Sequence, residues 1–184
     1  MILAFTGAGI SRASGIPTFQ DQDGLRDRLC RSFARSHPTE FQQTISDMCS
    51  VCKRAEPNDA HLALAEYEVP VITMNVDRLH QRAGTANLLA IHGSLPDIVL
   101  YGDPAPRYET AHNWVFQLRE GDIFLIVGTS FYTSISEQLR ISALSCGAEI
   151  VEINEAAERE VRRFLEENVR KMEPFSDFLV REIE

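Results

Sequence analysis

The stretch MILAFTGAGISRASGIPTF, residues 1–19, decides the fold class of this chain. Its residues 2–6 form an apolar run typical of a buried strand, and they lead directly into Gly7, Ala8 and Gly9. Such a turn at a helix start lets backbone N–H groups approach a pyrophosphate, because glycine has no Cβ and a helix N-terminus favours anions. The stretch therefore predicts the first strand and turn of an α/β domain.

The usual dinucleotide-binding fingerprint is incomplete in this stretch. That fingerprint needs a third glycine where Arg12 stands, and an acidic residue at the end of a second strand about 20 residues further on. The equivalent region here reads as a loop. Taken alone, the turn leaves two interpretations open, a nucleotide site and a tight structural turn.

Short apolar runs alternate with helical patterns along the rest of the chain. The helices are expected at 60–68, 111–120 and 134–145. Strand and helix alternating in this way indicate a doubly wound, mostly parallel sheet covered on both faces. The predicted strands are 2–6, 69–74, 88–92, 97–101, 123–129 and 148–154.

The length of 184 residues favours one main domain with at most a small appendage. Residues from about 21 to 57 interrupt the alternation with a polar, mainly helical insertion directly after the first strand. We expect this insertion to form a small lobe, with the core built from 1–20 and 58–184. The C-terminal tail is expected to be helical on both sides of Pro174.

Composition excludes several classes of partner and compartment. The net charge of -9 argues against binding to nucleic acid or to an anionic membrane surface, since both require a concentrated positive field. We expect a cytoplasmic protein, because the chain has no signal-type opening and no apolar run near the roughly 20 residues that span a bilayer. A secreted disulfide framework is not expected either. The cysteines are Cys30, Cys49, Cys52 and Cys146.

Cys49 and Cys52 form one C-x-x-C pair, which is half of a possible zinc site. Because no second pair stands at a usable spacing, we expect reduced thiols on a helix and no bound metal.

Polar residues and glycines follow five of the predicted strands. Taken alone, several of them have an ordinary structural explanation: Asn75 or Asp77 as a helix N-cap, His92 as a structural histidine, and Ser130 and Asn154 as caps or turn formers. Together they favour one crevice, since the carboxyl ends of parallel strands are where ligands bind in open α/β sheets. Beyond the glycine turn, the residues are Asn75, Asp77, His80, His92, Gly128, Ser130 and Asn154.

In this order the motifs resemble those of the sirtuins, the NAD-dependent protein deacylases. The similarity runs from about residue 3 to 155, and the joint specificity of its motifs is high. The similar blocks are GAGIS with GIPTF, PNDAHLALAE, TMNVDRLHQRAG, IHGSL, PDIVLYGD, IVGTS and VEIN.

The resemblance implies a Rossmann-like NAD-binding fold in which a crevice faces the small helical lobe. It implies that His92 is the general base on a ribose hydroxyl of NAD, a role that suits an imidazole titrating near neutrality. Asn75 and Asp77 would line the nicotinamide pocket, and the partner would be an acyl-lysine peptide or protein bound by Val99, Leu100, Gly102 and Asp103. The remaining NAD contacts implied are Gly7, Ala8, Gly9 and Ser11 at the pyrophosphate, Phe19 at the nicotinamide, and Gly128, Thr129, Ser130 and Asn154 toward the adenosine.

Several positions depart from the family pattern. The four-cysteine zinc ribbon that sirtuins carry between the His-Gly and Pro-Asp blocks is absent, since IHGSLPDIVLYGD joins the two blocks directly. The glutamine of the family's Thr-Gln-Asn segment is Met74, which lacks an amide to bond a ribose hydroxyl. Asp-Phe-Arg is replaced by Thr18-Phe19-Gln20.

These departures leave three functions to compare. The leading hypothesis is a minimal, zinc-free deacylase that transfers the acyl group from lysine to ADP-ribose and releases nicotinamide. A second is NAD hydrolysis or ADP-ribosyl transfer from the same site, which the open cleft and Met74 favour. A third is a non-catalytic NAD or ADP-ribose sensor, which the joint retention of Asn75, Asp77 and His92 disfavours. The oligomeric state is open.

Overall fold

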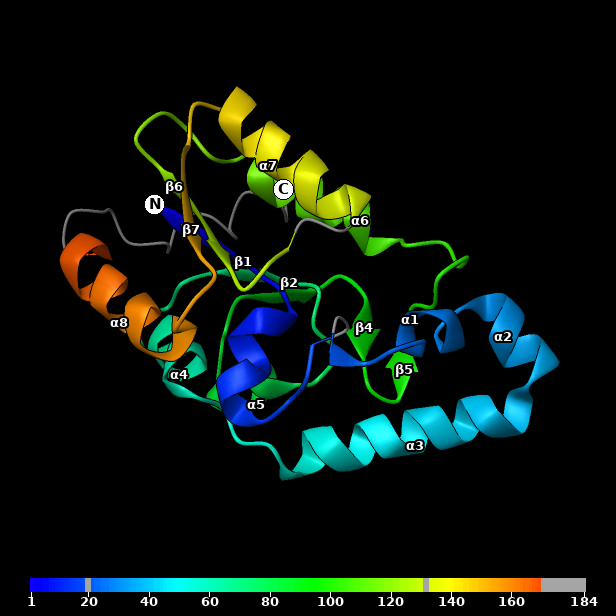
Figure 1. The fold of residues 1–184 in the computed structure, drawn as a ribbon. Helices are drawn as coiled ribbons and strands as arrows, with labels where there is room; N and C mark the ends of the chain where they lie inside the picture. The colour runs from blue at the N-terminus through cyan, green and yellow to red at the C-terminus, as the bar shows by residue number, and fades with distance from the viewer. Residues whose placement is uncertain (19–20, 131–132, 170–184) are drawn as a thin grey trace.

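The central feature of the fold is a parallel sheet. The computed structural model describes residues 1–18, 21–130 and 133–169. Within them, five strands pair in the order β3-β2-β1-β6-β7, all in parallel (Figure 1). The predicted mostly parallel sheet is thereby confirmed. The strands are β1 (Ile2–Thr6), β2 (Val71–Thr73), β3 (Leu88–Ala90), β6 (Ile123–Val127) and β7 (Glu149–Ile153).

Strand β1 lies in the middle of this sheet, where the winding reverses direction. The chain proceeds from β1 outward through β2 to β3, then returns to the other side of β1 to form β6 and β7. All residues of β1 are buried, as the continuous apolar run predicts for a strand covered on both faces. Ligand sites in open α/β sheets lie beyond the carboxyl ends at such a reversal, here between β1 and β6.

Two hydrophobic layers cover the two faces of the sheet. On one face, Ala4 and Leu125 pack with the helices α4 (Asp59–Glu66) and α8 (Ala157–Asn168). On the other face, Phe5 and Phe124 pack with α6 (Arg107–Val115) and α7 (Ser134–Ser145). Figure 1 shows α6 and α7 together on one side of the sheet, with α4 and α8 on the other. Side chains alternate between faces along each strand, so each strand supplies both layers. Burying each large apolar side chain contributes roughly 1.5–3 kcal/mol.

The insertion after β1 is helical, as predicted. Its helices are α1 (Leu25–Arg28), α2 (Arg31–Ser36) and α3 (Pro38–Arg54), and α3 begins with proline at a position that favours it. A separate apolar cluster joins Leu25 and Leu29 to Leu100 of the core chain. This cluster fixes the insertion beside the sheet. The exact division into core and lobe stays a prediction.

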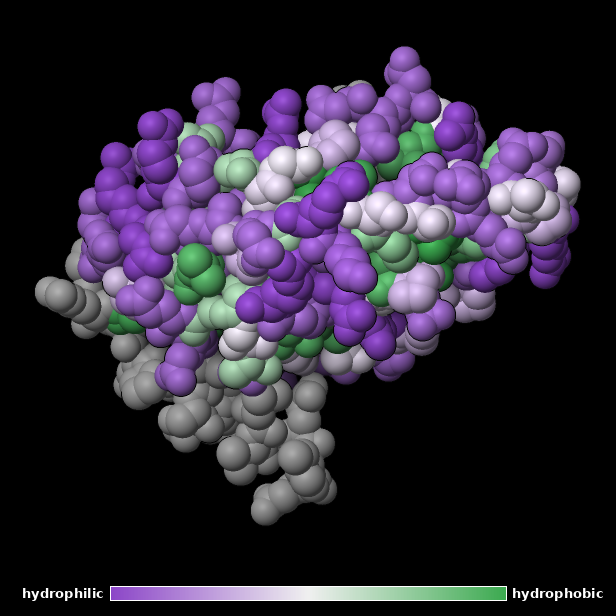
Figure 2. Space-filling view, turned by 90° about the horizontal axis from the view of Figure 1, so that it is seen from below, coloured by the Kyte–Doolittle hydropathy of each residue, from purple (hydrophilic) through white to green (hydrophobic). Residues whose placement is uncertain are grey.

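Helix α3 presents most of its length to solvent. Figure 1 shows it along the lower edge of the molecule, and Figure 2 shows the molecule from that side. Hydrophilic residues cover most of this face, and hydrophobic residues appear only in small areas. This agrees with the exposure along α3, where Thr44 is the buried residue.

Two sequence-based assignments are wrong. Residues 97–101 are not a strand of the main sheet: β5 (Asp97–Ile98) pairs antiparallel with β4 (Gly93–Ser94). Two residues join these strands, whereas a parallel neighbour requires a crossover of a dozen or more. The helix expected at 111–120 is α6, which begins four residues earlier, directly after Pro106.

The remaining short elements follow strands. A 3₁₀ helix, η1 (Ala8–Ser14), follows the glycine turn after β1, and α5 (Leu79–Ala83) follows β2. The predicted first helix of the C-terminal tail is α8, whereas the part beyond residue 169 lies outside the described residues. Across the described ranges, the helices are too short or too polar to cross a membrane.

Candidate active site

A cleft with a volume of about 720 Å³ lies at the carboxyl ends of the strands. This volume is within the range typical of small-molecule sites, about 300–1,000 Å³. The cleft brings together most of the residues predicted from the five strand ends and from the peptide side. They are Gly7, Ala8, Gly9, Asn75, His92, Val99, Leu100, Gly102, Asp103, Gly128, Thr129, Ser130 and Asn154. Ser11 and Asp77 lie elsewhere, and Phe19 is outside the described residues.

The glycines after β1 serve a contact between two loops. Gly7 N–H donates to the Val127 carbonyl and Gly9 N–H to the Gly128 carbonyl, each at 2.9 Å. A Cβ on Gly9 would lie 2.6 Å from Gly128 Cα, which leaves no room for a side chain. The sequence argument assigned these glycines to the approach of a pyrophosphate. In the structure, their small size and their N–H groups are already used by the neighbouring loop.

The loops after β6 and β7 are also joined. Gly128 N–H donates to the Ile153 carbonyl at 2.9 Å, and the amide oxygen of Asn154 accepts from Thr129 N–H at 3.0 Å. Hydrogen bonds therefore connect the loops after β1, β6 and β7, and together these loops form one rim of the cleft.

His92 lies between the backbone after β2 and helix α6. Its Nδ1 is 3.2 Å from the Met74 carbonyl, and its Nε2 is 2.9 Å from the Tyr108 hydroxyl. Because a carbonyl only accepts, Nδ1 carries the proton and Nε2 keeps its lone pair. Burial lowers the pKa of His92, while the Met74 contact acts in the opposite direction. His92 is therefore neutral at pH 7, as a general base must be.

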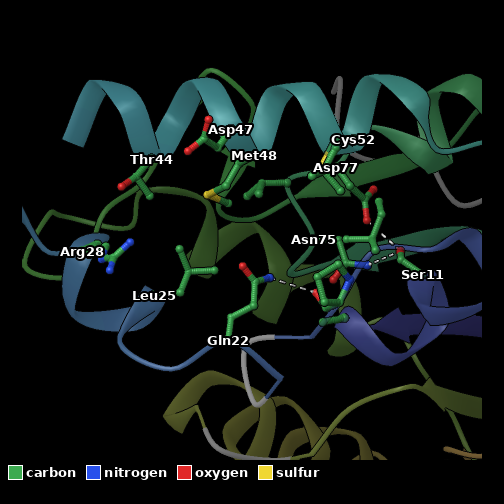
Figure 3. A pocket seen from close by; sticks show the side chains of 15 residues that line it. Ser11, Gln22, Leu25, Arg28, Thr44, Asp47, Met48, Cys52, Asn75 and Asp77 are labelled. Atoms are coloured by element: carbon green, nitrogen blue, oxygen red, sulfur yellow. Dashed lines mark hydrogen bonds between the residues drawn. The ribbon is translucent and has the colours of Figure 1, made fainter. Parts of the chain in front are cut away.

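A smaller cavity of about 200 Å³ opens beside the cleft and shares Ala8, Asn75 and Val76 with it. Figure 3 shows this cavity, with Thr44, Asp47, Met48 and Cys52 pointing into it from α3. Its opposite wall is formed by Ser11, Asn75 and Asp77.

Ser11, Asn75 and Asp77 are joined by hydrogen bonds at this wall (Figure 3). The Ser11 hydroxyl donates to Asp77 Oδ2 at 2.7 Å, and Asn75 Nδ2 donates to Ser11 Oγ and to the Gly7 carbonyl at 3.1 Å each. Asp77 Oδ1 accepts from Leu79 N–H at 2.9 Å, so the carboxylate also forms an Asx turn with the backbone two residues further on. Burial raises the pKa of Asp77. The wall is thus a fixed polar surface in a mainly apolar cavity.

Two histidines lie buried behind that wall. His61 Nε2 is 3.5 Å from Ser11 Oγ, and its Nδ1 is 3.1 Å from Asn58 Oδ1. His80 Nε2 is 2.9 Å from Thr6 Oγ1, and its Nδ1 has no hydrogen-bond partner among the described residues. The expectation that His80 faces the crevice is wrong, because α5 turns its side chain toward the sheet. Burial lowers the pKa of His61 to about 4.

Acid is expected to destabilise the fold through His61. Its pKa is about 4 in the folded state against 6.5 for a free histidine, so the unfolded chain binds a proton more readily between these values. Stability should fall as the pH drops from about 6.5 to about 4, with roughly 2 kcal/mol lost by pH 5 through this group. Urea unfolding at pH 7 and pH 5 measures the loss, which His61→Gln should reduce. His37→Gln, at an exposed site, is the control; an equal pH dependence in both variants would contradict the assignment.

The segment predicted to bind the peptide is held by the helical insertion. Arg31 Nε and Nη2 donate to the two oxygens of Asp103 at 2.7 and 2.6 Å, and this pair lowers the pKa of Asp103. Tyr101 N–H donates to the Leu29 carbonyl, and the Tyr101 carbonyl accepts from Arg31 N–H. The side chain of Leu100 is buried against Leu25 and Leu29. Val99 and Gly102, in the same segment, also line the cleft.

Comparison with known proteins identifies the family of this chain. The family model described as Sir2 family matches residues 7–96. NAD-dependent protein deacylase 1 of Caldanaerobacter subterraneus subsp. tengcongensis is 30% identical over 199 aligned residues, covering 84% of this chain and 82% of that protein. The chain belongs to the Sir2 family. NAD-dependent protein deacetylase 1 of Pyrobaculum aerophilum, another relative, is 32% identical and covers 83% of this chain and 78% of its own.

Solved Sir2 structures share the fold. A Sir2 homolog–NAD complex superposes with a TM-score of 0.82 at 24% identity, covering 92% of this chain and 89% of the other. An ADP-ribose complex of a Sir2 homologue variant gives a TM-score of 0.81 at 25% identity, covering 92% of each chain. The predicted Rossmann-like fold is confirmed.

The cleft of this Sir2 family member has the size of a small-molecule site, and its lining carries charges of both signs, with Asp21 and Asp103 as acidic residues. The N-terminus of η1 faces it, and Arg12 and Arg26 contribute to its lining. Arg12 makes a loose ion pair with Asp21 at 3.8 Å, and the Arg12 side chain is 65% exposed. A guanidinium at the cleft is a suitable partner for phosphate oxygens. The position that breaks the dehydrogenase fingerprint thus supplies a cation.

Metal-binding side chains are not gathered in the part of the chain that the structure describes. There, no three His, Cys, Asp or Glu residues lie close enough to hold a metal ion. Cys49 and Cys52 both lie on α3, and burial raises the pKa of the Cys52 thiol to about 11.

Sequence reasoning missed three residues of the site in this Sir2 family chain. Tyr108 lies outside the helix expected at 111–120, so no pattern connected it to His92. Arg31 belongs to an insertion whose contacts no periodicity reveals. His61 stands in the Pro-Asn-x-x-His motif, which was a usable signal, but its side chain supports the wall from behind.

Proposed function

We propose that the protein is an NAD-dependent protein-lysine deacylase that transfers the acyl group to ADP-ribose and releases nicotinamide. The observation that carries the proposal is the neutral imidazole of His92, with its lone pair at Nε2, in one cleft with the glycine loops and Asn75. The naming of the relatives as NAD-dependent protein deacylases supports it. When bound, NAD supplies the ribose carbon whose bond to nicotinamide breaks and to which the acyl oxygen is transferred.

The chain's own residues act by positioning and by proton transfer. Asn75 and Asp77, fixed by Ser11, offer hydrogen-bonding groups to a carboxamide in the smaller cavity. The apolar surroundings of that cavity exclude water and strengthen these contacts. His92 takes a proton from a ribose hydroxyl, which suits its lone pair at Nε2. The joined loops of β1, β6 and β7 hold the pyrophosphate and adenosine, with Arg12 facing the phosphates.

The acyl-lysine side uses the segment after β5. Val99 is proposed to accept from the acyl-lysine amide, and Gly102 and Asp103 to border a peptide strand added beside them. Leu100 supports this segment from the buried side, since its side chain packs into the insertion. Arg31 already holds the Asp103 carboxylate, so Asp103 acts through its backbone in this proposal.

An assay of products tests the function. The protein is incubated with NAD, with and without an acetyl-lysine peptide, and the products are identified by mass spectrometry. We expect free lysine peptide, nicotinamide and O-acetyl-ADP-ribose, each formed only when both reactants are present. Nicotinamide released equally without peptide would instead support NAD hydrolysis, and ADP-ribose attached to a protein side chain would support ADP-ribosyl transfer. Binding of NAD with no turnover would support a sensor.

The cytoplasmic location and the absence of zinc belong to the same proposal. The direct join between β4 and β5, in place of a four-cysteine ribbon, supports a zinc-free enzyme. Metal analysis of the purified protein tests this, and one equivalent of zinc per chain would overturn it.

A further inference from the structure

The basic nitrogen of His92 is already occupied by another side chain. Nδ1 carries its proton toward the Met74 carbonyl, so Nε2 holds the lone pair, and the Tyr108 hydroxyl lies 2.9 Å from that atom. Since Nε2 has no proton to donate, the Tyr108 hydroxyl is the donor in this bond. Nε2 is the one ring nitrogen of His92 that can accept a proton, and the Tyr108 hydroxyl lies against it. A proton transferred from a ligand in the cleft to His92 therefore passes through Tyr108.

Tyr108 is held in place rather than free to swing aside. It lies in the first turn of α6, and its side chain packs against the hydrophobic layer that contains Phe5 and Phe124. The preceding residue, Arg107, donates to the Ala90 carbonyl at 2.6 Å and so ties α6 to the end of β3. The hydroxyl oxygen thus has a fixed place beside His92, and both residues line the cleft.

We propose that Tyr108 relays the proton of a ribose hydroxyl of NAD to His92. This inference rests on the proposed function. Tyr108 oxygen accepts the ribose proton while its own proton passes to Nε2, so one O–H bond breaks at the ribose and one N–H bond forms at His92. Tyrosine ends unchanged, the imidazole becomes a cation and the ribose oxygen an anion, and no electrons are transferred. In this relay Tyr108 is a catalytic residue, because its hydroxyl contacts the reacting ribose hydroxyl, and His92 is the final acceptor of the proton.

The electrostatic environment agrees with this direction of transfer. Burial raises the pKa of Tyr108, so its hydroxyl stays protonated at neutral pH. Burial lowers the pKa of His92, so Nε2 is available to receive a proton. A donor and an acceptor are therefore present together at the working pH.

Kinetics of Tyr108→Phe test the relay. We expect kcat to fall roughly 10²-fold, the scale of a lost proton-transfer group, with KM for NAD unchanged. Rates in mixtures of light and heavy water should curve with deuterium content in the parent protein, because two protons move together, and become linear in the variant. Tyr67→Phe is the matched control, because Tyr67 packs against the opposite hydrophobic layer.

A second measurement needs neither NAD nor turnover. In the NAD-free protein labelled with ¹⁵N-histidine, the Nε2 resonance of His92 should have the shift of a hydrogen-bonded acceptor. It should move toward the value of an unbonded imidazole nitrogen in Tyr108→Phe and stay in place in Tyr67→Phe. An unchanged Nε2 resonance in Tyr108→Phe would overturn the relay even if the variant folds poorly.

The outcomes separate the relay from the function it rests on. No NAD-dependent turnover in the parent protein overturns the proposed function, and the relay with it. Turnover in the parent with unchanged kcat in Tyr108→Phe overturns the relay alone. A higher kcat in Tyr108→Phe also overturns it, since Tyr108 would then obstruct His92. The variant could also show a lower kcat while its rate curves with deuterium content as in the parent. Tyr108 would then have only a packing role, and the relay would be overturned as well.

Discussion

Replacing His92 by alanine is expected to lower kcat for deacylation by a factor of roughly 10²–10⁴, the contribution typical of a general base. The loss follows because Nε2 of His92 is the basic atom at the cleft, and the alanine side chain has no basic atom. Binding of NAD should remain, since the loops after β1, β6 and β7 hold one another without His92. Peptide turnover at saturating NAD gives kcat, and calorimetric titration gives the affinity for NAD.

The control for this substitution is His112→Ala. His112 lies on α6 outside the cleft, where it stacks on Phe116 and contacts Ser142. Its loss should leave kcat unchanged. The assignment of the base would be withdrawn if the His92 variant turned over peptide at the rate of the parent. If the His92 variant lost both NAD binding and turnover, His92 would be assigned to NAD binding instead.

The second large effect is expected from Gly128→Ala. Gly128 has φ of +62°, and a Cβ there would lie 2.2 Å from Ile10 N and 2.5 Å from Gly9 C. Both contacts are to backbone, which cannot move aside as a side chain can. Left-handed strain and overpacking together should cost roughly 2–5 kcal/mol. We expect a melting temperature lower by about 10 °C and much weaker NAD binding, measured by thermal unfolding and calorimetry.

Gly121→Ala separates the two causes. Gly121 also has positive φ, of +87°, but a Cβ there would meet nothing within 4 Å. This control should cost only the backbone strain, roughly 1–2 kcal/mol, and leave NAD binding intact. Equal losses of stability in the two variants would refute the argument that the two loops are in steric contact.

The sequence predicts the sheet well because burial on both faces leaves a strong local signal. Strands β1 and β6 are buried throughout, and Thr6 at the end of β1 is the one polar residue in them, so no other element fits these runs as well. Residues 97–101 carry the same apolar signal, yet they form a hairpin and a buried link to the insertion. The connection length, two residues between β4 and β5, decided their pairing.

The sequence predicts a site residue when that residue directly follows a strand. It does not predict where a side chain points when helix packing sets the direction of that side chain. The parallel strands bring Asn75, His92 and Asn154 to one edge of the sheet, as their positions after β2, β3 and β7 predicted. His80 also follows β2, but one turn of α5 directs it inward to Thr6. Likewise, Tyr108 is near His92 only because α6 returns to the end of β3.

The backbone contact between Gly9 and Gly128 has a consequence for engineering. The two loops meet with no side chain between them, so neither can change its length or course unless the other changes in step. Grafting a loop from a relative to alter cofactor preference should therefore fail when one segment is exchanged and succeed only when both are transplanted as a pair.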